Sequence, residues 1–174
     1  MNAFLKVLSA TGPHASLGRQ AETYGRVIGS WHGEMIDHFS GKTPQTHSIE
    51  AHFGWVLEGR AVQDVWITPA RTERETSEKR SVDWYGATFR VYDPKADLWR
   101  VIWSDPVSGQ RIELEGRPQG NDVVQLGMRA GRLIRWTFSE MRPDCFRWQG
   151  HALEDDGSTW RLEVDIQFKR LQND

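Results

Sequence analysis

The stretch 159-TWRLEVDIQFK-169 decides the fold that we predict for this chain. Its apolar side chains stand at alternate positions, with polar ones between them: Trp160, Leu162, Val164, Ile166 and Phe168 against Arg161, Glu163, Asp165, Gln167 and Lys169. A period of two residues is typical of a β-strand with one face in a core and the other in water. Most earlier segments also have the pattern of antiparallel strands, so partners for this strand are available. Left as an open edge, so apolar a strand would invite aggregation. We therefore expect this strand to close an all-β, up-and-down antiparallel barrel of about ten strands.

Length and composition limit the possible classes of protein. The chain has 174 residues, which suits one domain with a sizeable core. A net charge of -2 and a pI near 6.3 argue against nucleic acid or an anionic membrane as partners. Nine tryptophans predict a wide interior lined by aromatic rings. The single cysteine, Cys145, permits no internal disulfide.

The N-terminal part is expected to lie outside the sheet. Met1–Ser9 has neither the basic start nor the apolar length of a signal peptide, and no segment has the length and hydropathy to cross a bilayer, so we predict a cytoplasmic protein. Residues 1–14 are interpreted as a flexible lead, and residues 15–174 as the single barrel domain. Ser16–Ile28 has apolar spacing compatible with a short helix, which we expect to plug one barrel end.

The first strands set the inner face. Trp31–Phe39 is predicted to pair with His47–Leu57, with Trp31 opposite Trp55 and Met35 opposite Ala51. A tight turn at Glu58-Gly59 then carries the inner face into the strand after it. On that strand Asp64 falls opposite Phe53, and Asp64, Trp66 and Thr68 point into the barrel.

Later segments extend the meander. Pro69–Asp83 is long, charged and without periodicity, so it is a candidate lid loop. In the hairpin that follows, five side chains are expected to face inward: Phe89, Val91, Trp99, Val101 and Trp103. Asp105 follows in the same phase.

Two tight turns, Gln119-Gly120 and Ala130-Gly131, set the pairing near the end of the chain. They place Val123, Gln125 and Gly127 opposite Phe138, Trp136 and Ile134. The same register turns an apolar set outward, namely Val124, Leu126, Met128 and Leu133. Such a set needs a cover, either the N-terminal helix or another subunit, and we expect a homodimer.

A family resemblance agrees with this fold. Gly29-Ser30-Trp31-His32-Gly33, after a short helix and at the start of the meander, resembles the Gly-x-Trp opening of the calycin, or lipocalin-like, barrels. With Leu57-Glu58-Gly59-Arg60 and Val91-Tyr92-Asp93-Pro94, it is similar to the uncharacterised bacterial DUF1579 proteins, and more distantly to nitrobindins. The resemblance spans about residues 22–170 and implies a small-molecule cavity without an established activity. Nitrobindins hold haem through a late histidine; the late histidine here, His151, falls in the outward phase.

Three sets of polar residues are candidates for a site in such a cavity. Asp64, beside Trp66, is either a desolvated proton donor or acceptor, or a structural carboxylate bonded to the backbone or to a partner such as Arg90. Asp37, Thr68 and Asp105 either rim the barrel mouth or, for the two aspartates, terminate strands in solvent. Gln125 is either a hydrogen-bonding group for a ligand or a satisfied core amide.

Histidines suggest a possible metal site. His32 and Glu34 stand two residues apart on one predicted strand, and the expected register sets His52 opposite Glu34, a set with metal-ligand chemistry. The same register turns these side chains to solvent, where polar residues are common and need no functional explanation. We therefore keep them only as weak candidates and predict no cofactor.

The leading hypothesis is the binding of a small apolar or aromatic molecule inside the barrel. Its ligand would lie among Trp66, Trp103, Trp136 and Phe138 and be oriented by Asp64 and Gln125, with Asp37, Thr68 and Asp105 at the mouth. One alternative is a cofactor-free enzyme for proton transfer, isomerisation or cyclisation with Asp64 as its base; another is a metal- or haem-binding barrel. Motifs for a serine nucleophile, a phosphate loop or a zinc protease are missing from the sequence.

Overall fold

A computed structural model describes residues 2–39, 43–74 and 82–171 of the chain. Ten long strands follow one another: β2 (Gly29–Asp37), β3 (Gln45–Val56), β4 (Ala61–Thr68), β5 (Trp84–Asp93), β6 (Leu98–Asp105), β7 (Gln110–Gln119), β8 (Asp122–Arg129), β9 (Arg132–Ser139), β10 (Cys145–Leu153) and β11 (Trp160–Arg170). The short elements are α1 (Ala3–Leu8), β1 (Ser9–Ala10), η1 (Ala15–Gln20), α2 (Ala21–Gly25) and α3 (Arg71–Arg74).

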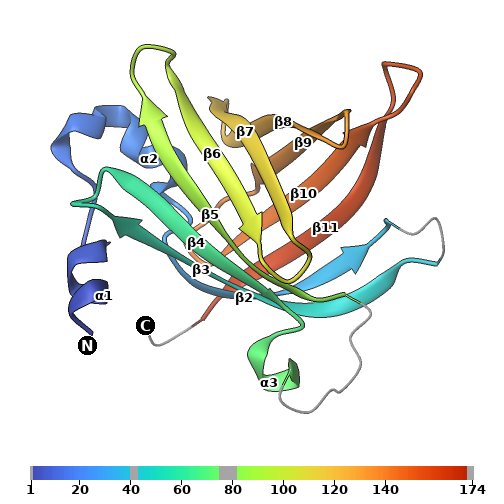
Figure 1. The fold of residues 1–174 in the computed structure, drawn as a ribbon, viewed down its shortest axis with the longest axis horizontal. Coiled ribbons are helices and arrows are strands. Elements are labelled where there is room, and N and C mark those ends of the chain that lie inside the picture. The colour runs from blue at the N-terminus through green and yellow to red at the C-terminus, as the bar shows by residue number, and fades with distance from the viewer. Residues whose placement is uncertain (1, 40–42, 75–81, 172–174) are drawn as a thin grey trace.

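The ten strands form a closed antiparallel barrel, as the sequence predicts (Figure 1). Each strand from β2 to β11 pairs with its neighbours in sequence, and β11 pairs with β2. Closure leaves none of these strands as an open edge, which answers the need that the apolar β11 creates. The prediction of a lipocalin-like up-and-down barrel of about ten strands is confirmed.

The helices η1 and α2 lie at one end of the barrel, which we call the plugged end (Figure 1). From α2, Tyr24 enters the core and is fully buried. The loop after α2 is tied to β2 because the indole N–H of Trp31 donates to the carbonyl of Val27 at 2.8 Å. The expected helix over Ser16–Ile28 is thus two short pieces, with non-helical backbone at Gly18 between the turns of η1. The C-terminal ends of β2, β4, β6, β8 and β10 lie at the other end, the open end.

The N-terminal segment contains regular structure, and the flexibility that the sequence predicts for residues 1–14 stays a prediction. Residues 3–8 form α1, and Ser9 and Ala10 form β1, which pairs with Val56 and Trp55 of β3. The segment therefore adds a short strand beside β3, beyond the point where the pairing of β3 with β2 ends.

The strand registers test the predicted pairings. Val123, Gln125 and Gly127 lie opposite Phe138, Trp136 and Ile134, and Phe53 lies opposite Asp64, all as predicted. The pairing of β2 with β3 is wrong by four residues, since Trp31 lies opposite Ala51 and Met35 opposite His47. An error of four residues is even, so it keeps every side chain on its predicted face.

The inward residues predicted on β5 are wrong by one position. Phe89 and Val91 point outward, and Val91 is 38% exposed, while Thr88 and Arg90 are buried on the inner face. Two contacts explain this phase: Arg90 forms a buried ion pair with Asp64, and the backbone of Gly86 packs beneath the ring of Trp103. A Cβ atom on Gly86 would lie 2.4 Å from that ring, so the inner face of β5 has no room for a side chain there.

The strand β11 contains a β-bulge that the alternation of its sequence does not reveal. Gly150 lies opposite Val164 and His151 opposite Leu162, so Glu163 has no partner across the ladder. The extra residue reverses the phase, and Trp160 and Leu162 leave the face that holds Val164. Trp160 instead packs under the guanidinium of Arg135, whose Cζ lies 4.4 Å from the ring centroid. The predicted inner face is therefore correct only from Val164 onward.

The loop from Pro69 to Asp83 begins with α3. Arg71 of α3 donates its backbone N–H and its Nε–H to one carboxylate oxygen of Glu50, at 2.7 and 2.8 Å. Burial opposes ionisation of Glu50, but these hydrogen bonds outweigh it and hold its pKa below the usual range. Residues 75–81 lie outside the described residues, so a lid role for this loop stays a prediction.

Candidate functional site

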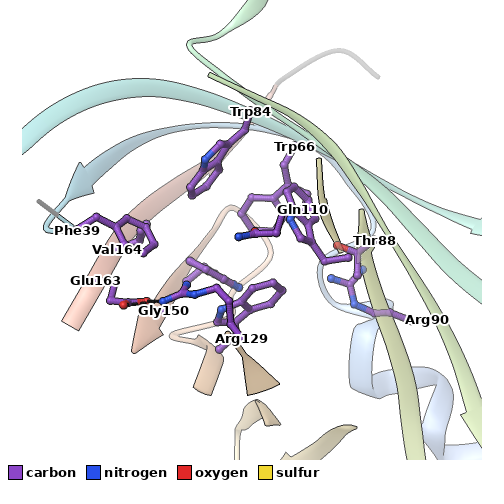
Figure 2. Close-up of a pocket in the computed structure, with 13 residues that line it drawn as sticks. Phe39, Trp66, Trp84, Thr88, Arg90, Gln110, Arg129, Gly150, Glu163 and Val164 are labelled. Atoms are coloured by element: carbon purple, nitrogen blue, oxygen red, sulfur yellow. Dashed lines mark hydrogen bonds and ion pairs between the residues drawn. The ribbon is translucent and has the colours of Figure 1, made fainter. Parts of the chain in front are cut away.

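A cavity of about 50 Å³ lies in the open half of the barrel (Figure 2). The plugged half is filled by rings in edge contact, such as Tyr24 with Trp99 and Phe138 at centroid distances of 5.1 and 6.0 Å. The cavity is lined by Phe39, Trp66, Trp84, Thr88, Arg90, Trp103, Gln110, Arg129, Trp136, Trp148, Gly150, Glu163 and Val164. The barrel is thus packed at one end and hollow over a small volume at the other.

Five tryptophans make a continuous arc around the cavity. Neighbouring ring centroids lie 6.4 Å apart for Trp84–Trp103 and Trp103–Trp136, and 5.5 Å apart for Trp136–Trp148 and Trp148–Trp66. The arc, which we call the tryptophan arc, draws one ring from each of β4, β5, β6, β9 and β10. Gly150 contributes no side chain, so the cavity extends against the ring of Trp148. Such a surface offers apolar contact together with ring edges and faces.

A buried ion pair lies beside the cavity. Asp64 accepts a short hydrogen bond from Nη1 of Arg90 through one oxygen, and the backbone N–H of Thr88 at 2.8 Å through the other. The Arg90 side chain is 2% exposed and that of Asp64 is fully buried. The guanidinium of Arg90 also lies over the ring of Tyr24, with 4.9 Å between Cζ and the ring centroid. Of the two roles that the sequence left open for Asp64, the structure shows the arrangement of a structural carboxylate, because both oxygens are hydrogen-bonded. Asp64 does not line the cavity.

Tyr24 connects this ion pair to the plug. Its hydroxyl oxygen accepts a hydrogen bond from the amide of Gln125 at 2.8 Å. Burial raises the pKa of Tyr24, so the phenol is neutral around neutral pH. A Cβ atom on Gly116 would lie 2.4 Å from the hydroxyl, which shows how closely β7 approaches it. Gln125 thus bonds to the plug, away from the cavity lining.

A second ion pair lies at the cavity mouth. Both carboxylate oxygens of Glu163 accept from Nη2 of Arg129, at 2.7 and 2.6 Å, and Arg161 donates to one of them at 3.1 Å. The Glu163 side chain is 3% exposed although it comes from a sequence position predicted to face solvent. The bulge in β11 turns the Glu163 side chain toward the cavity mouth. Phe39 covers the pair from outside, with the Cζ atom of Arg129 5.2 Å from its ring centroid (Figure 2).

The site residues predicted from sequence divide into two groups. Trp66, Trp103 and Trp136 line the cavity, whereas Phe138 packs in the filled core among Tyr24, Phe53, Trp66 and Phe146. The three predicted rim residues lie at the open end but bond to neighbouring parts of the chain instead of lining the cavity. Asp37 accepts the N–H of Phe39 at 2.8 Å, and Thr68 donates to the carbonyl of Ser48 at 2.7 Å. The carboxylate of Asp105 accepts hydrogen bonds from the N–H of Val107 at 3.1 Å and from the hydroxyl of Ser108 at 2.7 Å.

Several lining residues escaped the sequence prediction: Trp84, Thr88, Arg90, Gln110, Arg129, Trp148, Gly150 and Glu163. A signal existed for Arg129, which continues the inward phase of Gln125 and Gly127 along β8. Thr88 and Arg90 were missed because the predicted phase of β5 is wrong by one residue. Glu163 was missed because the alternation of the β11 sequence does not reveal the bulge.

The histidine set does not assemble into a metal site. His32 and Glu34 are exposed, and Glu34 lies opposite Ser48, so the predicted pairing of His52 with Glu34 is wrong. His52 instead contacts Ser30 through Nδ1 at 2.9 Å and Glu50 through Nε2 at 3.3 Å. Across the part of the chain that the structure describes, no three His, Cys, Asp or Glu side chains are arranged to hold a metal ion.

Comparisons with known proteins support the fold. Neither a family model nor a curated protein sequence matches the chain. Among solved structures, the barrel is similar to the S-type phycobiliprotein lyase CPES from Guillardia theta, with a TM-score of 0.58, 11% identity, and coverage of 88% of this chain and 93% of that one. It is also similar to Rv2717c from M. tuberculosis, with a TM-score of 0.61, 12% identity, and coverage of 92% and 99%. The chain therefore shares a lipocalin-like barrel fold with both structures.

Within residues 2–39, 43–74 and 82–171, no helix is long and apolar enough to span a membrane.

Proposed function

We propose that this protein binds a small aromatic molecule in the cavity beside the tryptophan arc. The observation that carries the proposal is the arc itself, because five indole rings converge on a space that their own packing leaves unfilled. Protein interiors are normally packed without such gaps, and cavities with apolar walls and a few polar groups are typical ligand sites. We place this binding in the cytoplasm, on the sequence prediction.

The volume of the cavity limits the size of the ligand. About 50 Å³ is room for a few water molecules, and a cavity that holds benzene measures roughly 150 Å³. A single ring therefore fits only with some movement of the side chains at the mouth, where Phe39 is 43% exposed and Arg129 is 22% exposed. A tetrapyrrole is much larger, so haem or bilin binding would require the packed core to open. This argues against the haem alternative.

A blocking variant tests the proposal. Thr88→Leu adds bulk at a lining position, while the backbone N–H that bonds to Asp64 stays in place. We expect toluene, benzaldehyde and indole to quench the tryptophan fluorescence of the native protein saturably and to raise its melting temperature, and to do neither in Thr88→Leu. The matched control is Ala87→Leu, on the outer face of the same strand. A native protein that responds to no member of the panel, or a Thr88→Leu response equal to the native one, would contradict the proposal.

The homodimer stays a prediction that the outer surface supports. Leu126 and Met128 are 40% and 55% exposed, so η1 and α2, which lie at the plugged end where the sequence predicts the N-terminal helix, do not cover them. These residues and Leu133 line a surface groove with Ile102. We expect sedimentation to show a dimer for the native chain and a monomer for Met128→Lys. A native protein that sediments as a monomer would refute the prediction.

A further inference from the structure

Two buried N–H groups beside the cavity have no acceptor in the described part of the chain. They are Nε1 of Trp66 and Nε of Arg90, and both residues line the cavity. The two side chains are nearly inaccessible, with residue exposures of 4% and 1%. Buried donors in proteins are nearly always bonded, so these two N–H groups, on side chains that line the cavity, call for an acceptor that the described part of the chain does not supply.

The charges around the cavity are already balanced. Arg90 is paired with Asp64, and Arg129 is paired through two hydrogen bonds with Glu163. An anionic ligand would therefore meet no uncompensated cation on the lining, and it would bring a charge close to two buried carboxylates. A neutral acceptor pays no such cost and still satisfies an N–H group.

We propose that the ligand is a neutral, single-ring aromatic molecule with a carbonyl-type oxygen, such as an aldehyde, ketone or amide. Its ring packs against the tryptophan arc, and its oxygen accepts from the unpaired N–H groups of Trp66 and Arg90. The inference rests on the proposed function, because it specifies the chemistry of the same ligand. It differs from the sequence prediction, in which Asp64 and Gln125 orient the ligand, since those two side chains are bonded to Arg90 and Tyr24.

Three probes of nearly equal size separate the possibilities: benzaldehyde, toluene and benzoate. From fluorescence titrations of the native protein, we expect benzaldehyde to bind at least tenfold more tightly than toluene, because one hydrogen bond of ordinary strength contributes about that much and the proposed ligand oxygen accepts two. Benzoate is expected not to bind. If toluene binds as tightly as benzaldehyde, or if benzoate binds best, the inference is overturned and the proposed function stands. If none of the three binds, both are overturned.

Trp66→Phe removes one of the two N–H groups and keeps an aromatic ring, so it is expected to reduce the preference for benzaldehyde over toluene severalfold. Trp99→Phe is the matched control. Trp99 is also fully buried, and its Nε1 likewise has no partner among the described residues, but it packs against Tyr24 in the plugged half. A Trp99→Phe protein should keep the preference of the native protein. Equal loss in both variants, or no loss in Trp66→Phe, would overturn the assignment.

A spectroscopic measurement on the native protein covers the case in which Trp66→Phe does not fold. In proton–nitrogen correlation spectra, saturation with benzaldehyde should move the indole N–H resonance of Trp66 downfield, and toluene should not. The resonance of Trp99 should stay in place with both probes. A Trp66 resonance that moves equally with the two probes shows that no hydrogen bond forms to the oxygen, and overturns the inference.

Discussion

Replacing Asp64 by Asn is expected to lower the free energy of unfolding by about 3–5 kcal/mol. The substitution leaves the guanidinium of Arg90, with 2% of its side chain exposed, without its counter-charge in the core. Desolvation makes an unpaired buried charge far more costly than the loss of an exposed pair. Chemical denaturation of both proteins, with the same slope assumed for the transition, gives the difference directly.

Two further variants separate charge burial from packing. The double variant Asp64→Leu, Arg90→Met replaces the pair with apolar groups and is expected to recover most of the lost stability. Glu113→Gln breaks an exposed ion pair with Arg111, and its effect should stay below about 1 kcal/mol. An Asp64→Asn protein as stable as the native one would show that Arg90 does not depend on this carboxylate.

Replacing Tyr24 by Ala is expected to cost about 3–5 kcal/mol, the range for deletion of a large buried aromatic side chain. The change removes ring contacts with Trp99 and Phe138, and it uncovers the guanidinium of Arg90. Tyr24→Phe removes only the hydroxyl, which accepts from the Gln125 amide, and should cost about 1–3 kcal/mol. Both values come from denaturant titration.

The matched control for the plug is Tyr85→Ala. Tyr85 is 43% exposed on the outer face of β5, so its loss should change the stability by roughly 0.5 kcal/mol or less. If Tyr24→Ala were no more harmful than Tyr85→Ala, α2 would rest on the barrel without stabilising its plugged end.

The parts of the fold that were predictable are those where short turns set the register. Turns of two residues lie at both ends of β8, and the pairing of Gln125 with Trp136 followed from the turn that joins β8 to β9. A longer loop joins β2 to β3, and there the predicted register slipped by four residues. Trp66, Trp103 and Trp136 were placed correctly on the inner face because an even slip does not exchange the faces of a sheet.

The polar part of the site was not predictable from alternation alone. On β5, Phe89 and Val91 are the more apolar residues, yet the buried pair of Arg90 with Asp64 turns the strand the other way. On β11, a single extra residue moves Glu163 from the water face to the cavity mouth. Both cases depend on contacts between one strand and the next. Hydropathy along one strand does not report such contacts.

The most direct test of the central claim is a crystal soaked with 4-bromobenzaldehyde. We predict an anomalous difference peak from bromine inside the barrel, with the ring against Trp66, Trp136 and Trp148. A bromine peak only on the outer surface, or a cavity that contains nothing but ordered water at saturating ligand, would contradict it.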